Sequence, residues 1–266
     1  MLIEPFLAKL ARQHACLVTV QSTRGSVPRE QGAWMAVFDD EVVGTVGGGQ
    51  LEFQAIAQAH GHLREGLVAS ASPVRYALGP SLGQCCGGEV HLKFEVVHED
   101  HIAELSTRLK VALAPVALFG GGHVGKALIQ VLANLPFAVT WIDSRDEIFS
   151  TGLPAQIRCE HSHPVQAAVA GLDVGSKVVI MSFSHAEDLD VVAACLLRQR
   201  AQGDLPFIGL IGSKTKWSRF RHQLELRGFS PGELDCVTCP IGVAGVHSKL
   251  PEVIAVAVAA QLLLEL

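Results

Sequence analysis

The chain of 266 residues is 49% hydrophobic and 18% charged, and its 21 Lys and Arg against 26 Asp and Glu give a formal net charge of -5. This composition excludes a disordered chain, and the length supports one large or two modest domains with real cores. The acidic balance argues against nucleic-acid binding through a general positive field. The most apolar stretch has about 12 residues, well short of the roughly 20 that cross a membrane. With no secretion signal at the amino terminus, we expect a cytoplasmic protein with no membrane or nucleic-acid partner.

The first part of the chain, residues 1–98, alternates short strand-like runs with glycine-rich loops. The runs are rich in β-branched residues or alternate in polarity, which is typical of half-buried strands. This pattern predicts an α+β domain whose function lies in its loops. The expected elements are strands at 16–22, 34–38 and 90–97 and a helix at 50–63.

The sequence becomes regular after residues 99–114, which we expect to form a connecting helix. In 115–266, runs of Val, Ile and Leu alternate with helical segments, which predicts a parallel sheet covered on both faces. The fold class is therefore α/β, with the α+β domain followed by a Rossmann-like parallel-sheet domain. The expected strands are 116–122, 137–143, 176–184 and 206–212, and the expected helices are 123–135, 165–172, 188–200, 214–228 and 250–266.

The first strand–helix turn of the second domain fits the pattern G-x-G-x-x-G with Gly120, Gly122 and Gly125. Such a turn lets a phosphate approach the backbone at a helix amino terminus, where His123 would face it. Asp143 ends the next strand, close to the roughly 20-residue offset of a ribose-binding carboxylate. The pattern leaves three alternatives open, which are a phosphorylated ligand, a nicotinamide cofactor, and glycines that only permit tight packing.

Two loops of the first domain can attract an anion. Arg24 and Arg29 flank a short loop and could clamp an oxyanion between them, although surface arginines in a solvated loop remain an alternative. A second turn that can bind an anion is formed by Gly47, Gly48 and Gly49 before the expected helix. Glu52, in the first turn of that helix, is compatible with a role that only favours the helix dipole.

Seven cysteines at irregular spacings argue against a secreted disulfide scaffold. Cys85 and Cys86 stand between glycines, so we expect accessible thiols suited to a metal with sulfur chemistry. Burial as small apolar residues and a strained vicinal disulfide are the alternatives. Cys236 and Cys239 form a C-x-x-C without a second such pair, so we expect Cys239 to belong to a functional loop and Cys236 to be incidental.

Several segments together resemble the XdhC/CoxI family of xanthine dehydrogenase accessory proteins, which are molybdenum cofactor chaperones. The resemblance spans nearly the whole chain and follows the same order in both domains. It is carried by VTVQSTRGSVPREQGAWM, GTVGGGQLEFQAI, LGPSLGQCCGG, FGGGHVGKAL, IGLIGSKTKWSRF and TCPIG.

The resemblance implies a non-enzymatic homodimer that carries molybdenum cofactor, supports its sulfuration with a cysteine desulfurase, and inserts it into apo-xanthine dehydrogenase. In the family motifs, Cys85 and Cys86 are the possible molybdenum contacts. The alternatives are an NAD(P)-dependent oxidoreductase that uses the Rossmann turn, and a scaffold that only bridges the two partner proteins. The expected cofactor-binding residues are Arg24, Arg29, Gly47, Gly48, Gly49, Cys85, Cys86, Gly120, Gly122, His123, Gly125, Asp143 and Cys239.

Overall fold

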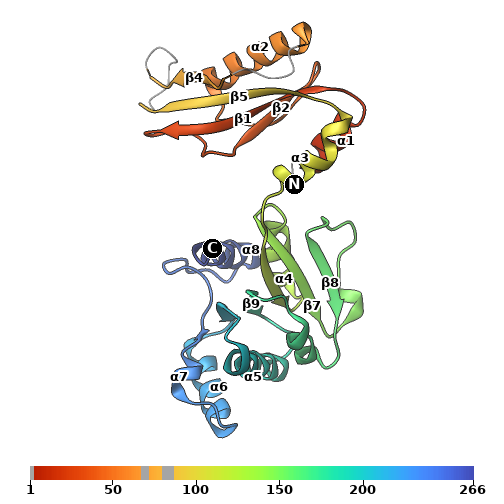
Figure 1. Ribbon diagram of the computed structural model, residues 1–266. Helices are drawn as coiled ribbons and strands as arrows, with labels where there is room; N and C mark the ends of the chain where they lie inside the picture. The colour runs from red at the N-terminus through yellow and green to blue at the C-terminus, as the bar shows by residue number, and fades with distance from the viewer. Residues whose placement is uncertain (1–2, 67–71, 80–86) are drawn as a thin grey trace. The chain divides into compact units, whose positions relative to one another are not determined.

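The computed structural model describes residues 3–66, 72–79 and 87–266 (Figure 1). The chain divides into two compact units between Lys110 and Val111. The first unit contains an antiparallel sheet and the second a parallel one, which confirms the α/β class and the predicted succession of an α+β and a Rossmann-like domain. Cys85 and Cys86 lie outside the described residues.

The first unit is a five-stranded antiparallel sheet of order β3-β2-β1-β5-β4 with helices on both faces (Figure 1). Alternate residues of β1 point to opposite faces, so Val18 packs in the cluster beneath α2 while Leu17 packs with α1 and α3. The elements are α1 Ile3–Leu10, β1 Ala15–Arg24, β2 Trp34–Val37, β3 Val42–Gly44, α2 Gly49–Glu65, β4 Val74–Ala77, β5 Glu89–Val97, the 3-10 turn η2 Glu99–His101 and α3 Ile102–Arg108.

The segment expected to form one connecting helix, 99–114, is divided differently. Only η2 and the short helix α3 are helical, and Leu105 of α3 is fully buried in the same apolar cluster as Phe6 of α1. Ile102, Leu105 and Leu109 therefore belong to the core of the first unit, whereas Val111 is exposed and Ala114 packs in the second unit.

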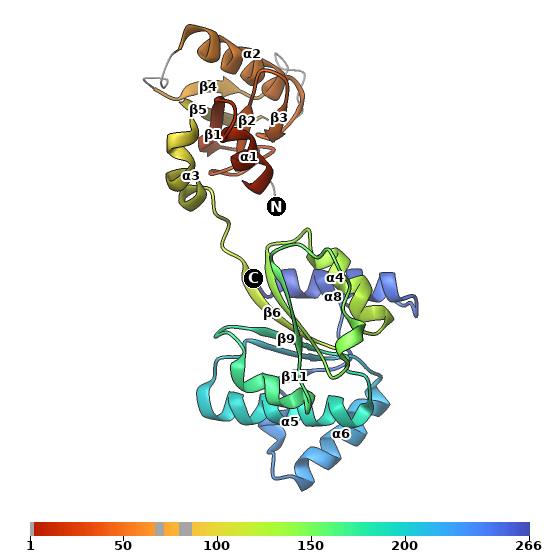
Figure 2. The ribbon, with the colours of Figure 1, turned by 90° about the vertical axis from the view of Figure 1, so that its right-hand side faces the viewer.

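The second unit is a six-stranded parallel sheet of order β11-β10-β9-β6-β7-β8. The strand order reverses between β6 and β9, and ligands of open α/β sheets bind at such a switch point, outside the carboxyl ends of the strands. Helices α4 and α8 cover one face, and α5 and α6 cover the other (Figure 2).

The bounds of this unit follow the predicted elements, apart from the segment 165–172, which is a 3-10 turn. Strands β8 and β11 are additional. The elements are β6 Ala114–Phe119, α4 His123–Leu132, β7 Phe137–Asp143, the 3-10 turn η3 Asp146–Ile148, β8 Ile157–His161, the 3-10 turn η4 Val165–Gly171, β9 Lys177–Ile180, α5 His185–Gln202, β10 Phe207–Leu210, α6 Lys214–Leu226, α7 Pro231–Leu234, β11 Val237–Thr238 and α8 Pro251–Leu264.

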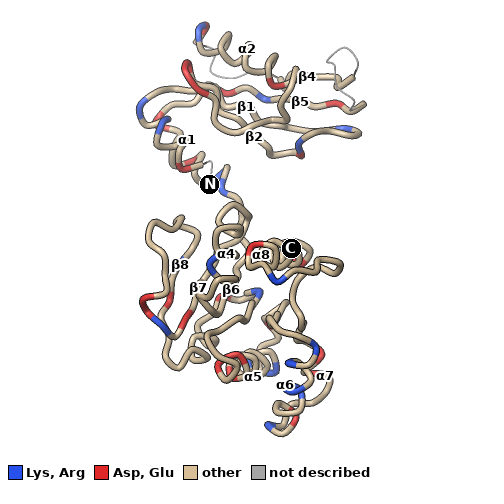
Figure 3. The backbone as a smooth tube through the Cα atoms, turned by 180° about the vertical axis from the view of Figure 1, so that it is seen from behind, with Lys and Arg blue, Asp and Glu red and all other residues tan. Residues whose placement is uncertain are grey.

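Acidic and basic residues both occur on α5 and α6 of the second unit (Figure 3). Three exposed ion pairs of α5 and α6 illustrate this: Arg200–Glu233, Arg221–Asp235 and Arg227–Asp190. Within the described part of the chain, no helix combines the length and the apolar character needed to cross a membrane.

Candidate functional site

Three loops of the first unit meet at one end of its sheet. A Cβ at Gly47 would lie 2.4 Å from Cγ of Pro28, and one at Gly88 would lie 2.2 Å from the carbonyl oxygen of Ser26. Glycine is required at both positions because the neighbouring loop fills the space of a side chain. The loop that bears Arg24 and Arg29 is therefore packed against the Gly47 turn and against the end of the segment that follows Cys85 and Cys86.

The two arginines of this loop are available to a ligand. Both Arg24 and Arg29 are exposed, and neither side chain has a hydrogen bond or ion pair to another described residue. Glu89 lies opposite Arg24 in the β1–β5 register, but its carboxylate is paired with Arg75, whose hydrogen bond lowers the pKa of Glu89. An oxyanion beside the Arg24 and Arg29 guanidinium groups would thus break no internal ion pair, although the charge of Arg24 also acts on Glu89.

The glycine turn before α2 is already occupied by a carboxylate of the chain itself. Oε2 of Glu52 accepts hydrogen bonds from the Thr45 hydroxyl at 2.5 Å and from the backbone N–H groups of Val46 and Gly48 at 3.0 and 3.1 Å. These are donors that an external anion at this turn would need. Glu52 therefore does more than favour the helix dipole, since it takes the Gly48 donor of the predicted turn, while Gly47 N donates to the Thr45 hydroxyl.

The glycines of the second unit's turn have different roles. Gly120 has φ +118°, and a Cβ there would lie 1.9 Å from the carbonyl oxygen of Met181, while a Cβ at Gly125 would lie 2.2 Å from the carbonyl oxygen of Gly120. Close packing of the backbone explains why glycine stands at both Gly120 and Gly125. Gly122, the N-cap of α4, has an ordinary φ of -67° and nothing within 4 Å of its Cβ position. The exposed side of the turn at Gly122 and His123 is thus open.

Asp143 accepts a hydrogen bond from the buried side of the turn, in contrast to its predicted role as an acceptor for a ribose hydroxyl. Its side chain is 1% exposed, and its two oxygens accept four hydrogen bonds, from Gly121 N at 2.6 Å and from the N, Nε and one terminal nitrogen of Arg145. Burial is the strongest single influence and raises the pKa of Asp143, but these donors outweigh it and hold the pKa below its ordinary value. A carboxylate that is bonded in this way has no free lone pair for a ribose hydroxyl.

The loops that follow β7 and β9 supply residues that sequence reasoning missed. The guanidinium of Arg145 lies 4.3 Å from the ring centroid of Phe183, whose side chain is 65% exposed. Arg145 follows Asp143 by two residues, and this proximity was the available signal. The sequence offered no such signal for Phe183, because an aromatic residue at the end of an apolar strand is normally predicted to lie in the hydrophobic core.

A buried ion pair lies further along the same edge of the sheet. Nζ of Lys216 in α6 lies 2.6 Å from Oδ2 of Asp188 in α5 and donates to the carbonyl oxygen of Ile211 at 2.8 Å. Asp188 also accepts from the backbone N–H of Ser182 at 2.7 Å. The pair links the loops after β9 and β10, so it positions this edge of the sheet.

Cys239 lies close to that ion pair but is not a thiolate at neutral pH. Burial raises the pKa of the Cys239 thiol to about 11, although the charge of Lys216 acts in the opposite direction. Cys236 is exposed, and the residues between the two cysteines are the extended strand β11. Two strand residues stand between the cysteines, so three chain steps of about 3.3 Å place their Cα atoms about 10 Å apart, beyond the roughly 7 Å limit of a disulfide. The C-x-x-C is therefore not a dithiol pair in this conformation.

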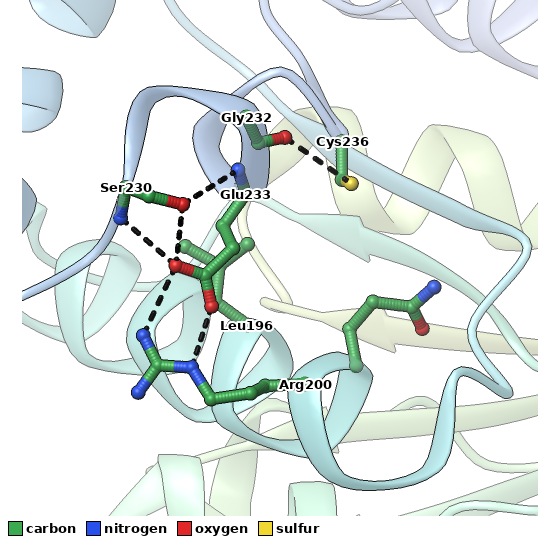
Figure 4. A pocket seen from close by; sticks show the side chains of 7 residues that line it. Leu196, Arg200, Ser230, Gly232, Glu233 and Cys236 are labelled. Carbon is green, nitrogen blue, oxygen red and sulfur yellow. Dashed lines mark hydrogen bonds and ion pairs between the residues drawn. The ribbon is translucent and has the colours of Figure 1, made fainter.

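A cavity of about 330 Å³ lies between α5 and α7, away from the sheet edge (Figure 4). Its polar groups are already paired: Glu233 accepts from the Arg200 guanidinium and from the N–H and hydroxyl of Ser230. These bonds, that from Arg200 first, lower the pKa of Glu233 to about 2. The exposed Cys236 thiol lines the same cavity and points to the carbonyl oxygen of Gly232 (Figure 4). The arrangement caps and ties down α7, and we assign it a structural role.

Comparison with known proteins identifies both units. Residues 116–262 match the XdhC Rossmann domain, and residues 8–72 match the XdhC and CoxI family. The chain is 26% identical over 266 residues to the uncharacterized protein YqeB of Escherichia coli (strain K12), covering 96% of this chain but 44% of YqeB, so it spans less than half the length of that relative. A crystal structure described as a xanthine dehydrogenase from Bacillus halodurans has a TM-score of 0.80 at 20% identity, over 99% of this chain and 95% of that one, which shows a shared fold. Because the Rossmann match alone covers more than half of the sequence, the chain belongs to the XdhC family.

Proposed function

We propose that this chain takes part in the maturation of xanthine dehydrogenase by binding molybdenum cofactor, protecting it and inserting it into the apo-enzyme. The observation that carries the proposal is the meeting of three loops in the first unit, where Gly47 contacts Pro28 and Gly88 contacts Ser26. The loops bring the backbone of the segment that carries Arg24 and Arg29 next to Gly88, which follows Cys85 and Cys86 closely in the chain. A phosphate-bearing pterin dithiolene with a metal of sulfur chemistry needs both kinds of group.

In this proposal the chain is a carrier and not an enzyme. Arg24 and Arg29 would hold the phosphate, and a sulfur of Cys85 or Cys86 would lie near molybdenum, shielding it or relaying sulfur. A cysteine desulfurase would be the second partner, and the carrier would act as a cytoplasmic homodimer. Cys239, with its raised pKa, would contribute a neutral thiol and no metal ligand.

The competing function, an NAD(P)-dependent oxidoreductase, needs Asp143 to accept the ribose hydroxyls. That role would require Arg145 to leave a carboxylate to which it donates three hydrogen bonds. The proposed carrier function does not require Arg145 to leave Asp143, and we therefore favour it.

The test is to express the chain in a host that makes molybdenum cofactor and purify it without oxygen. Pterin is then assayed after oxidation to its fluorescent form, and molybdenum by mass spectrometry. We expect both near one per subunit, with a loss of at least ten-fold in the double variant Arg24→Ala/Arg29→Ala. Arg64→Ala, which removes an exposed arginine at the far end of α2, is the matched control and should retain both.

The cysteine pair needs a separate variant, Cys85→Ala/Cys86→Ala, assayed for bound molybdenum and for activation of apo-xanthine dehydrogenase in vitro. Retention of metal and full activation would exclude the thiol role while leaving the arginine role intact. Pterin and molybdenum both at background in the unmodified chain would contradict the proposed function as a whole.

A further inference from the structure

We propose that the outer face of α8 is an interface between two copies of this chain, whose α8 helices pack against each other in antiparallel orientation. The outer face consists of Val253, Val256, Ala260, Leu263 and Leu264. This inference goes beyond the proposed function, because it assigns the surface through which two copies meet and uses no property of the cofactor.

Helix α8 is apolar around its whole circumference. Between Glu252 and Glu265 its only polar side chain is that of Gln261. Oε1 of Gln261 accepts a hydrogen bond from the backbone N–H of Gly242 at 2.6 Å, so this amide is used inside the second unit. A helix that is hydrophobic on all sides is normally buried on all sides.

The second unit covers only one side of this helix. The residues of α8 that are buried in the same apolar cluster as residues of α4 and of the sheet (Figure 2) are Ala255, Val258, Ala259 and Leu262. The residues of the outer face follow one another at helical spacing and form one stripe, in which Val256 is 57% and Leu264 79% exposed. A contiguous apolar surface without a charged side chain marks a protein interaction site.

The charges at the two ends of α8 favour a second copy as the occupant of this face. Lys249 lies just before the helix and Glu265 at its C-cap; both are exposed, and neither has an ion pair with another described residue. The helix dipole has the same sense, positive at the amino end and negative at the carboxyl end, and Glu252 in the first turn already favours it. An antiparallel pair brings each positive end beside the negative end of the other copy, whereas a parallel pair brings like ends together.

The middle of the outer face fits two-fold symmetry. A two-fold axis midway between positions 256 and 260 places Val256 of each copy opposite Ala260 of the other, and Val253 opposite Leu263. A small side chain at the centre lets two helices approach closely. The same face therefore serves both copies, as an interface with two-fold symmetry requires.

The test is sedimentation analysis of the full chain. We expect a dimer with a Kd of about 1 μM or tighter, and Val256→Lys should raise this Kd about 100-fold or more, because two unpaired ammonium groups would be buried. At concentrations where both proteins are monomeric, the melting temperature of the variant should not fall, since lysine suits an exposed helix position at least as well as valine. Leu226→Lys, at an exposed leucine of α6, is the matched control and should leave Kd within about two-fold of the unmodified chain.

A mixture of two variants tests whether α8 pairs with α8. Val256→Lys and Val256→Glu should each dimerise weakly alone, because like charges meet across the two-fold axis. Mixed in equal amounts, they should form a mixed dimer with a Kd about ten-fold or more below that of either variant alone. Native mass spectrometry identifies this dimer when one variant carries an affinity tag. If α8 packed on a different surface of the second copy, the two charges would not meet and the mixture would gain no affinity.

Three results would overturn the proposal: a chain that stays monomeric at about 100 μM, a dimer whose Kd is unchanged in Val256→Lys, or a mixture that gains no affinity. The first means that a different occupant covers the face, and the other two mean that two copies meet elsewhere. Assays of pterin and molybdenum keep the two proposals separate. A dimer that Val256→Lys disrupts in a chain without pterin would retain this inference while contradicting the proposed function, and pterin bound by a monomeric unmodified chain would do the reverse.

Discussion

The two glycine-rich turns of this protein look alike in sequence and differ in structure. Each stands directly before a helix, α2 in the first unit and α4 in the second. In the first, the Glu52 carboxylate accepts from the backbone N–H groups of Val46 and Gly48. In the second, Asp143 takes only Gly121 N from behind, and the exposed side at Gly122 stays open. A glycine turn before a helix is thus a site only where the protein has not already supplied its own anion.

The largest effect that tests this contrast is expected for Gly120→Ala. The new Cβ would overlap the carbonyl oxygen of Met181, and φ +118° is unfavourable for any residue with a side chain. We expect the free energy of unfolding to fall by about 4 kcal/mol or more, as measured by chemical denaturation. A loss below about 1 kcal/mol would mean that the turn can relax and that its glycines are not fixed by packing.

Removal of the internal anion of the second turn, Asp143→Ala, should cost about 2–3 kcal/mol, since it leaves Gly121 N and Arg145 without their partner. Arg145→Ala and the double variant complete a thermodynamic cycle. The double variant should lose less than the sum of the single losses, whereas strict additivity would show that the pair is not coupled.

The same carboxylate predicts a pH dependence. Because the pKa of Asp143 is lowered in the folded state, its contribution is present above the ordinary range of an aspartate and is lost as pH falls through the folded-state value. Between pH 7 and pH 3 the unmodified chain should therefore lose more stability than Asp143→Ala. Equal losses in the two proteins would contradict an ionised Asp143 in the native turn.

Removal of the internal anion of the first turn, Glu52→Ala, should cost about 1–2 kcal/mol because Val46 N, Gly48 N and the Thr45 hydroxyl lose their acceptor. The vacated donors should then accept an external anion. Inorganic phosphate should raise the melting temperature of the variant more than that of the unmodified chain. Equal shifts would show that the turn is not an anion site even when it is open.

The smallest effect is expected for Gly122→Ala, a loss of less than about 1 kcal/mol, because nothing lies within 4 Å of the new methyl group. Comparison with Gly125→Ala, where the methyl group would meet the carbonyl oxygen of Gly120, separates a packing glycine from an open one within a single motif. A similar large loss of unfolding free energy in Gly122→Ala and Gly125→Ala would contradict the interpretation of Gly122 as an open position.

Local sequence pattern predicted the longer strands and helices and the order of the two units. The runs of Val, Ile and Leu and the glycine turn at 120–125 predicted β6, α4 and β7 and the parallel sheet, because burial on both faces imposes a continuous apolar pattern. The same reasoning missed the short edge strands β3, β4, β8 and β11 and the short helices α1 and α7. Sequence reasoning also predicted a single helix over 99–114. The sequence does not show that Leu105 packs against Phe6 of α1.

The sequence by itself determined where the turns, arginines and candidate acids stand along the chain, and with them the family. Only the tertiary structure decided which donors are free. The Glu52 carboxylate is close in sequence to the turn it fills, and Asp143 lies a whole helix away from Gly121, yet both satisfy a glycine turn from within. Arg145 and Phe183 meet only because β7 and β9 flank β6. A hydrogen bond needs its two atoms within about 3 Å, and that proximity is set by the packing of the sheet and not by spacing along the chain.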